Sequence, residues 1–157
     1  MLYSTIGHYS LVLGLCVSLL LVFFSIKNFK NSEILSSKVL SFTFLQFFLV
    51  VVSFSSLIIS FVLSDFSNET VFNNSHTTKP FFYKIAGTWG NHEGSLLLWL
   101  LVLTLFILIF ILKTKHQPIK YKLLTLIFQQ IIIIGFFLFL IETSNPFNYL
   151  YPAPDEG

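Results

Sequence analysis

The sequence predicts an all-α integral membrane protein with four transmembrane helices. Hydrophobic residues make up 55% of the 157 residues and charged residues only 10%, whereas an average soluble domain contains about 25% charged residues. The apolar residues also form four long runs, and a helix needs roughly 20 residues to cross a hydrocarbon core about 30 Å thick. We therefore expect a single membrane domain over residues 1–157.

The first two predicted helices span residues 5–26 and 39–63. The first run lacks the basic start of a secretory signal, and its length fits a retained helix. Small and polar residues recur inside both runs, and in lipid such residues favour close contact between helices. We therefore expect a helix bundle to bury them. They are Ser10, Gly14, Ser18, Gln46, Ser53, Ser56 and Ser60.

A long loop, residues 64–94, is predicted between the second and third helices, and it divides into two halves. Residues 64–78 are polar and rich in Asn and Ser, so we expect a mobile tether there. The second half is aromatic and punctuated by glycine, and it leads directly into the third helix, predicted over residues 95–112.

Asn91 is the candidate N-cap of the third helix, and Glu93 suits the positive end of the helix dipole. A helix that starts there places His92, Ser95 and Trp99 on one face. Aromatic residues at this depth favour a belt that anchors the protein at the membrane surface. The alternative is a surface that faces a flat apolar ligand or a partner. Its candidate residues are Trp89, Gly90, His92, Glu93, Gly94, Ser95 and Trp99.

His92 does not predict a zinc-protease site, because Leu96 occupies the second histidine position of H-E-x-x-H. A lone histidine beside a glutamate at a helix start is more often a hydrogen-bonded structural residue. His8 lies near the same predicted membrane surface, although its spacing from His92 does not require the two to be close.

The fourth predicted helix spans residues 121–141, and a tail over residues 142–157 follows it. Gln129 and Gln130 lie inside this helix, where their amides require interhelical partners.

Lysine positions predict the orientation of the helices. All nine basic residues are lysine, and seven of them lie in the two short loops. Because positive residues are retained on the inner side of a membrane, both termini and the long central loop are predicted on the outer side. Six of the seven acidic residues also fall on that outer side, the exception being Glu33. The seven lysines are Lys27, Lys30, Lys38, Lys113, Lys115, Lys120 and Lys122.

One run of residues carries a family resemblance. Residues 83–99 read Tyr-Lys-Ile-Ala-Gly-Thr-Trp-Gly-Asn-His-Glu-Gly-Ser-Leu-Leu-Leu-Trp. This is similar to the Trp-Gly-x-His-Glu-Gly-Ser-hydrophobic-Trp signature at the third helix of the CcmF-type cytochrome c haem lyases. Residues 143–157, with Ser-Asn-Pro-Phe and Pro-Ala-Pro-Asp-Glu-Gly, resemble the segment after that family's fourth helix, and residues 7–13 and 46–61 agree as well. The chain thus resembles the N-terminal portion of the family.

The resemblance implies a part in cytochrome c maturation, in which haem vinyl groups are joined to the thiols of an apocytochrome c. It implies haem as the cofactor of the complete complex. The family's tryptophan-rich haem loop and its haem ligands lie outside the matched segment. We therefore assign no catalytic residue and no metal ligand here, and no haem ligand among His8, His76, His92 and His116.

The resulting hypothesis is the N-terminal subunit of a split lyase, a scaffold that is not catalytic alone. Its expected partners are the lyase subunits that carry the haem loop, apocytochrome c and membrane lipid. The alternative is a non-catalytic structural subunit of a respiratory complex, derived from the lyase. A transporter is disfavoured because no charged residue lies deep in the apolar runs, and a net charge of +2 without a basic cluster argues against nucleic acid.

Residue usage bears on the compartment. Lysine as the sole basic residue type, with 20 phenylalanines, is typical of an AT-rich genome. This favours the mitochondrial inner membrane, with a bacterial inner membrane as the alternative.

Overall fold

The computed structural model describes residues 2–27, 35–114 and 116–157. These residues form α-helices and no named β-strand. Four helices are long and apolar enough to cross a membrane, which confirms the predicted fold class. The helices are α1 (Leu2–Lys27), α2 (Leu35–Val62), α3 (Glu69–Asn74), α4 (Phe81–Gly87), α5 (His92–Lys113) and α6 (Ile119–Glu142).

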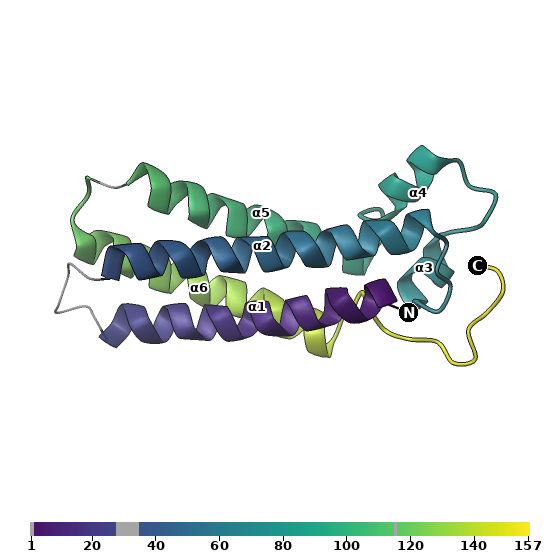
Figure 1. The fold of residues 1–157 in the computed structure, drawn as a ribbon, viewed down its shortest axis with the longest axis horizontal. Coiled ribbons are helices and arrows are strands. Elements are labelled where there is room, and N and C mark those ends of the chain that lie inside the picture. The colour runs from purple at the N-terminus through teal and green to yellow at the C-terminus, as the bar shows by residue number, and fades with distance from the viewer. Residues whose placement is uncertain (1, 28–34, 115) are drawn as a thin grey trace.

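The four long helices lie side by side as a bundle (Figure 1). α1 packs against α2 and α6, and α5 packs against the same two helices, so the order around the bundle is α1, α2, α5, α6. α3, α4, the N-terminus and the tail over residues 143–157 gather at one end of the bundle, which we call the capped end. The C-terminal ends of α1 and α5 and the N-terminal ends of α2 and α6 lie at the opposite end.

The long helices begin earlier than their apolar runs. They start at residues 2, 35, 92 and 119, against predicted starts at 5, 39, 95 and 121. Each helix can begin before its apolar run because the unpaired backbone N–H groups of its first turn then lie outside the hydrocarbon core, where water binds them. Lys30, Glu33 and Lys115, which the topology prediction uses, lie outside the described residues.

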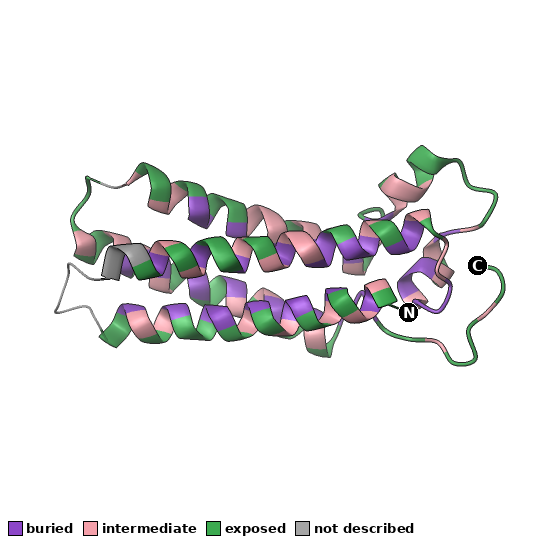
Figure 2. Ribbon diagram, viewed as in Figure 1, coloured by how far each residue is buried: buried purple, intermediate pink, exposed green. Residues whose placement is uncertain are grey.

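Apolar side chains from all four long helices fill the centre of the bundle. Figure 2 shows the buried positions recurring along the facing sides of the helices and continuing into α3. The larger cluster joins Leu11, Leu57, Leu100 and Phe137 with Phe147 of the tail. The core therefore extends from the membrane-spanning helices into the capped end.

Two glutamines tie the bundle together near its middle. The Gln46 and Gln130 amides donate to each other, at 3.0 and 2.9 Å, and both side chains are fully buried. Gln46 also donates to the Ser18 hydroxyl. These bonds link α1, α2 and α6 and confirm the predicted interhelical partners for Gln46 and Gln130. The buried oxygen of Gln129, by contrast, has no partner within the described residues.

Small residues let α1 approach its neighbours closely. Ser10, Gly14 and Ser18 are all buried, as their four-residue spacing predicts. A Cβ added to Gly14 would lie 2.7 Å from the Phe137 ring, so a larger residue would force this ring of α6 to shift.

The prediction of a mobile tether over residues 64–78 is wrong, because this segment is packed into the structure. Phe66, Asn68 and Val71 are buried there, and Phe66 and Val71 belong to the larger core cluster. Asn68 caps α3 by accepting from the Val71 N–H at 3.1 Å. The largely polar composition of the segment does not predict that these two apolar side chains are buried or that a helix is capped there.

Candidate functional site

Asn91 sets the start of α5, as the sequence predicts. Its Oδ1 accepts from the Gly94 N–H at 2.7 Å. Its Nδ2 donates to the carbonyl oxygen of Gly87 at 2.8 Å. The side chain therefore caps α5 and also binds the end of α4, which positions the Trp89-containing turn between the two helices.

Gly94 allows that turn to rest on the first turn of α5. A Cβ added to Gly94 would overlap the backbone carbonyl oxygen of Thr88, and Gly94 is buried. Because the obstacle is backbone, it has no rotamer through which to move away. The glycine therefore has a packing role at this position.

The structure places the seven candidate surface residues in different environments. His92, Ser95 and Trp99 share one face of α5, and Trp99 is 60% exposed. Glu93 lines a polar cavity instead, and Gly90 lines a wider cavity on α4 and the α3–α4 loop. The candidate surface is thus a strip along α5 rather than one continuous platform.

Aromatic side chains surround the entry to α5 at the capped end. Trp89 is 42% exposed, and Phe81, Phe82 and Tyr83 of α4 are more exposed still. Phe81 and Phe82 meet edge to face, with ring centroids 5.8 Å apart. Their exposure is consistent with membrane-surface anchors and equally with a contact surface.

Two adjacent residues of the tail hold two histidines of distant helices. The Ser144 hydroxyl lies 3.3 Å from Nδ1 of His92, whose ring also meets Phe139 edge to face. The Asn145 amide lies 3.2 Å from Nδ1 of His8. His8 and His92 are therefore both brought to the capped end through Ser144 and Asn145.

Sequence reasoning missed Ser144 and Asn145 as site residues. They stand 52 and 137 positions from their histidine partners, so no local pattern predicts the pairing. The available signal was the Ser-Asn-Pro-Phe segment itself, whose asparagine also accepts from the Phe147 N–H at 3.0 Å.

The tail crosses the capped end and closes it. Phe147 is buried against Gly7, where a side chain would overlap its ring. The Glu69 N–H donates to Asn148, and the Leu150 N–H donates to Ser67, at 3.0 and 2.9 Å.

Asn68 joins these segments from the centre of the capped end. Its fully buried amide donates to the Ser4 hydroxyl at 3.0 Å and to the Pro146 carbonyl at 2.9 Å. One side chain thus connects the start of α1, the start of α3 and the tail.

A polar cavity of about 230 Å³ lies beside the tail. The carboxylates of Glu69 and Glu93 line it together with hydroxyl and amide side chains from α3 and the tail. The latter are Thr70, Asn73, Asn74, Thr143, Ser144, Asn145 and Asn148. Glu93 therefore faces other polar groups and not the exposed strip of α5.

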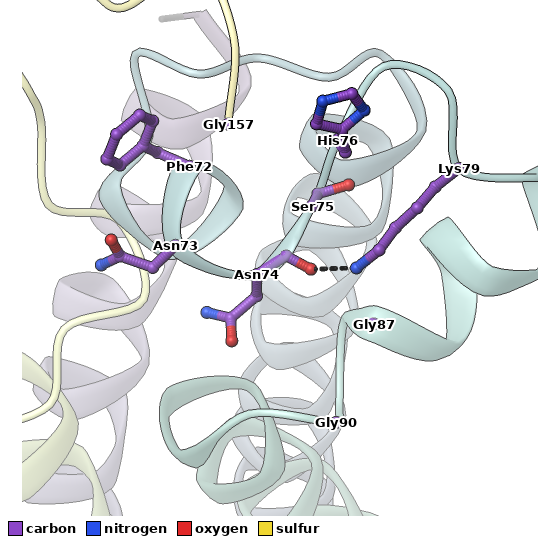
Figure 3. Close-up of a pocket in the computed structure, with 9 residues that line it drawn as sticks. All are labelled: Phe72, Asn73, Asn74, Ser75, His76, Lys79, Gly87, Gly90 and Gly157. Atoms are coloured by element: carbon purple, nitrogen blue, oxygen red, sulfur yellow. Dashed lines mark hydrogen bonds between the residues drawn. The ribbon is translucent and has the colours of Figure 1, made fainter.

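A second cavity, of about 530 Å³, opens between α3, α4 and the end of the tail (Figure 3). On one side of it the Lys79 ammonium donates to the carbonyl oxygen of Asn74 at 2.7 Å. Gly87 and Gly90 line another part of the wall, and Gly157 lies against Phe66 and Ser75.

Glu156 ties the tail to the α3–α4 loop. It accepts from the backbone N–H and the hydroxyl of Thr77, at 2.8 and 2.9 Å, and lies 3.4 Å from Nε2 of His76. The pKa of Glu156 is lowered from its usual 4.5, chiefly because the Thr77 N–H donates to the carboxylate, with further lowering by the Thr77 hydroxyl and His76.

Within residues 2–27, 35–114 and 116–157, no group of three His, Cys, Asp or Glu side chains is placed to hold a metal ion. The arrangement at the capped end offers hydrogen bonds and aromatic surface. It is a scaffold in which polar side chains connect helix ends.

Comparison with known proteins identifies relatives of this chain. It is 40% identical over 153 residues to the cytochrome c-type biogenesis protein CycK of Rhizobium meliloti, covering 97% of this chain and 23% of that protein. It is 37% identical over 150 residues to CcmF of Haemophilus influenzae, covering 95% and 23%, and 35% identical over 156 residues to CcmF of Escherichia coli, covering 97% and 24%. No family model matches the chain.

A solved structure shares the fold. The cytochrome c haem lyase CcmF superposes with a TM-score of 0.86 at 24% sequence identity, covering 96% of this chain and 25% of that one. The chain spans about a quarter of the length of the relatives that it matches. These similarities establish that the chain is homologous to the N-terminal part of the CcmF and CycK cytochrome c-type biogenesis proteins.

Proposed function

We propose that this chain is the N-terminal scaffold subunit of a CcmF-type haem lyase, which attaches haem to apocytochrome c. The observation that carries the proposal is similarity over 95 to 97% of the chain to cytochrome c-type biogenesis proteins. The chain corresponds to about a quarter of those proteins, and in this proposal the haem platform and the catalytic groups belong to the part of the lyase that this chain does not cover.

The scaffold role follows from the packing at the capped end. Asn68 and Asn145 each connect segments far apart in the chain, Asn91 joins the end of α4 to the start of α5, and Phe147 extends the core into the cap. Such cross-links hold the first turn of α5 in one position. A rigid helix start is what a contact surface for haem or a partner subunit requires.

The exposed strip of α5 is the proposed contact surface. His92, Ser95 and Trp99 share one face, and Trp89 is exposed in the preceding turn. In this proposal the strip faces haem or the partner subunit in the complete complex. The remaining candidates have supporting roles, since Gly94 admits the turn while Glu93 and Gly90 line separate cavities.

The proposed orientation places the capped end on the outer side of the membrane, where apocytochrome c would be met. The lysine distribution supports it, because Lys27, Lys38 and Lys113 lie at the opposite end of the bundle. Lysine-only basic composition favours the mitochondrial inner membrane, whereas the bacterial origin of the relatives favours a bacterial inner membrane.

Purification of the native complex tests the function. The tagged chain should be recovered from solubilised membranes with a polypeptide that carries the rest of the lyase, including a tryptophan-rich loop, and cells lacking the chain should lose covalent haem from cytochrome c. Recovery with respiratory-complex subunits alone, with normal cytochrome c, would instead support the structural alternative.

A further inference from the structure

His8 is held in one tautomer by its contacts in the capped end. The Asn145 Oδ1 accepts from the backbone N–H of Phe147 at 3.0 Å, and a backbone N–H can only donate. This identifies the other amide atom of Asn145, 3.2 Å from His8 Nδ1, as the NH₂ group. The NH₂ group must donate, so His8 Nδ1 must accept and carries no proton.

The neutral ring therefore carries its proton on Nε2. No hydrogen-bond acceptor for this N–H is found among the described residues, where the ring is hydrogen-bonded to Asn145 through Nδ1 and meets the Tyr9 ring edge to face. An imidazole in this state is a hydrogen-bond donor at Nε2, and it lacks the free Nε2 lone pair that a metal ligand needs.

His8 lines a cavity of about 300 Å³ with Thr5, Tyr9 and Tyr149. The hydroxyls of Thr5 and Tyr149 are hydrogen-bonded to each other, which joins α1 to the tail at this point. Tyr9 is 63% exposed and Tyr149 46% exposed, so the cavity opens to the surroundings of the bundle. Among the described residues no charged side chain lines it, which favours an uncharged acceptor over an anion or a cation.

The position of His8 along α1 corresponds to the boundary between headgroups and hydrocarbon. α1 contains 26 residues and is therefore about 39 Å long, against a hydrocarbon core of about 30 Å. His8 lies about 9 Å from the start of the helix, and its side chain tilts toward that start. The uncharged acceptors that a bilayer supplies near this level are the ester carbonyls of phospholipids.

We propose that the cavity formed by Thr5, His8, Tyr9 and Tyr149 binds the glycerol-ester region of a phospholipid, with the Nε2–H of His8 donating to an ester carbonyl. The lipid belongs to the leaflet at the capped end. The proposal needs only a membrane-spanning α1 and does not depend on the lyase assignment.

Matched lipids test the proposal on the full chain in detergent micelles. A diester phosphatidylethanolamine and its diether analogue differ in the ester carbonyls alone, and native mass spectrometry gives the affinity for each. Wild-type protein should bind the diester about threefold to tenfold more tightly, as expected for one hydrogen bond. Equal binding of the two lipids would overturn the proposal.

Three variants test whether the preference for the diester lipid depends on His8. His8→Phe should reduce the diester preference to about onefold, whereas His8→Gln, which keeps an N–H donor at a similar place, should retain most of it. His116→Phe, at an exposed histidine at the opposite end of the bundle, is the matched control and should behave as wild type. A preference that survives in His8→Phe would contradict the assignment.

Nitrogen-15 spectra of histidine-labelled protein test the tautomer without any substitution. The His8 ring should show a proton on Nε2 and none on Nδ1. A proton found on Nδ1 would overturn the donor role, whatever the lipid titrations give. Loss of the lipid preference leaves the co-purification test of the lyase role unaffected, so the two proposals fail separately.

Discussion

Gly94 shows how one missing side chain positions the candidate surface. The carbonyl oxygen of Thr88 occupies the place of a Cβ, so the turn before α5 rests on the helix backbone. Elsewhere in the same bundle Gly135 has no atom within 4 Å of such a Cβ. The two glycines therefore differ in the space available for a side chain, and this difference should appear in the stability of alanine variants.

Gly94→Ala should destabilise the protein by about 1–3 kcal/mol or more, because the new methyl group meets backbone that has no alternative rotamer. Gly135→Ala is the control and should change stability little or raise it by up to about 1 kcal/mol, through helix propensity. Thermal unfolding in detergent measures both. Equal midpoints for the two variants would show that the turn does not rest on α5 as described.

Gln46 and Gln130 join α2 to α6 with two reciprocal hydrogen bonds. Replacing either one by Leu leaves the other amide without the two hydrogen bonds of the pair, although Gln46 keeps its bond to Ser18, whereas replacing both removes the need for a partner. We therefore expect the double variant to lose less stability than the sum of the single variants, with a coupling of about 0.6–1.7 kcal/mol.

Unfolding in mixed micelles measures this coupling, and Gln129→Leu supplies the control. The Gln129 oxygen is buried without a partner in the described part of the chain, so its replacement should be neutral or stabilising. Additive losses for Gln46 and Gln130 would show that the pair does not act as a unit.

The tail contact made by Glu156 should depend on pH. A carboxyl whose pKa is lower in the folded state stabilises the contact above its usual pKa of 4.5, and the contribution is lost as the pH falls through the lowered value. The protection of residues 76–78 and of the tail against hydrogen exchange, measured relative to the intrinsic exchange rate at each pH, should therefore fall below pH 4.5.

Glu156→Gln should remove this pH dependence and increase exchange at neutral pH, since a neutral amide accepts more weakly from Thr77. Asp155→Asn, next to it in the exposed tail, is the matched control. Unchanged exchange in Glu156→Gln would mean that other contacts hold the tail in place.

The features that the sequence predicted depend on neighbouring residues, whereas the features that it did not predict depend on contacts between residues far apart in the chain. The long helices follow from apolar runs, and the start of α5 follows from the Asn91 cap, because both depend on neighbouring residues. The packed 64–78 segment and the Ser144 and Asn145 contacts depend on residues far away in the chain. Their partners are set by folding of the whole bundle, which local patterns do not encode.

The orientation of the bundle in the membrane is a prediction for the complete molecule. In a Cys16→Ser background, a single cysteine at Thr78 should react with a membrane-impermeant thiol reagent added to the outer side. A cysteine at His116 should react only after the membrane is opened, because residue 116 follows the end of α5 and precedes α6, and these helix ends lie opposite the capped end. The reverse pattern would move the capped end to the inner side and remove it from the proposed site of haem attachment.

The central position of Asn68 has a consequence for biosynthesis. Its amide is shared between Ser4, made at the start of translation, and Pro146, made after all four long helices. Until residues 146 and 147 emerge from the ribosome, the nascent chain lacks both the Pro146 acceptor and the Phe147 ring that fills the space beside Gly7. Membrane insertion of the helices thus precedes closure of the cap, and a ribosome that stalls before residue 143 would release an open bundle to quality-control proteases.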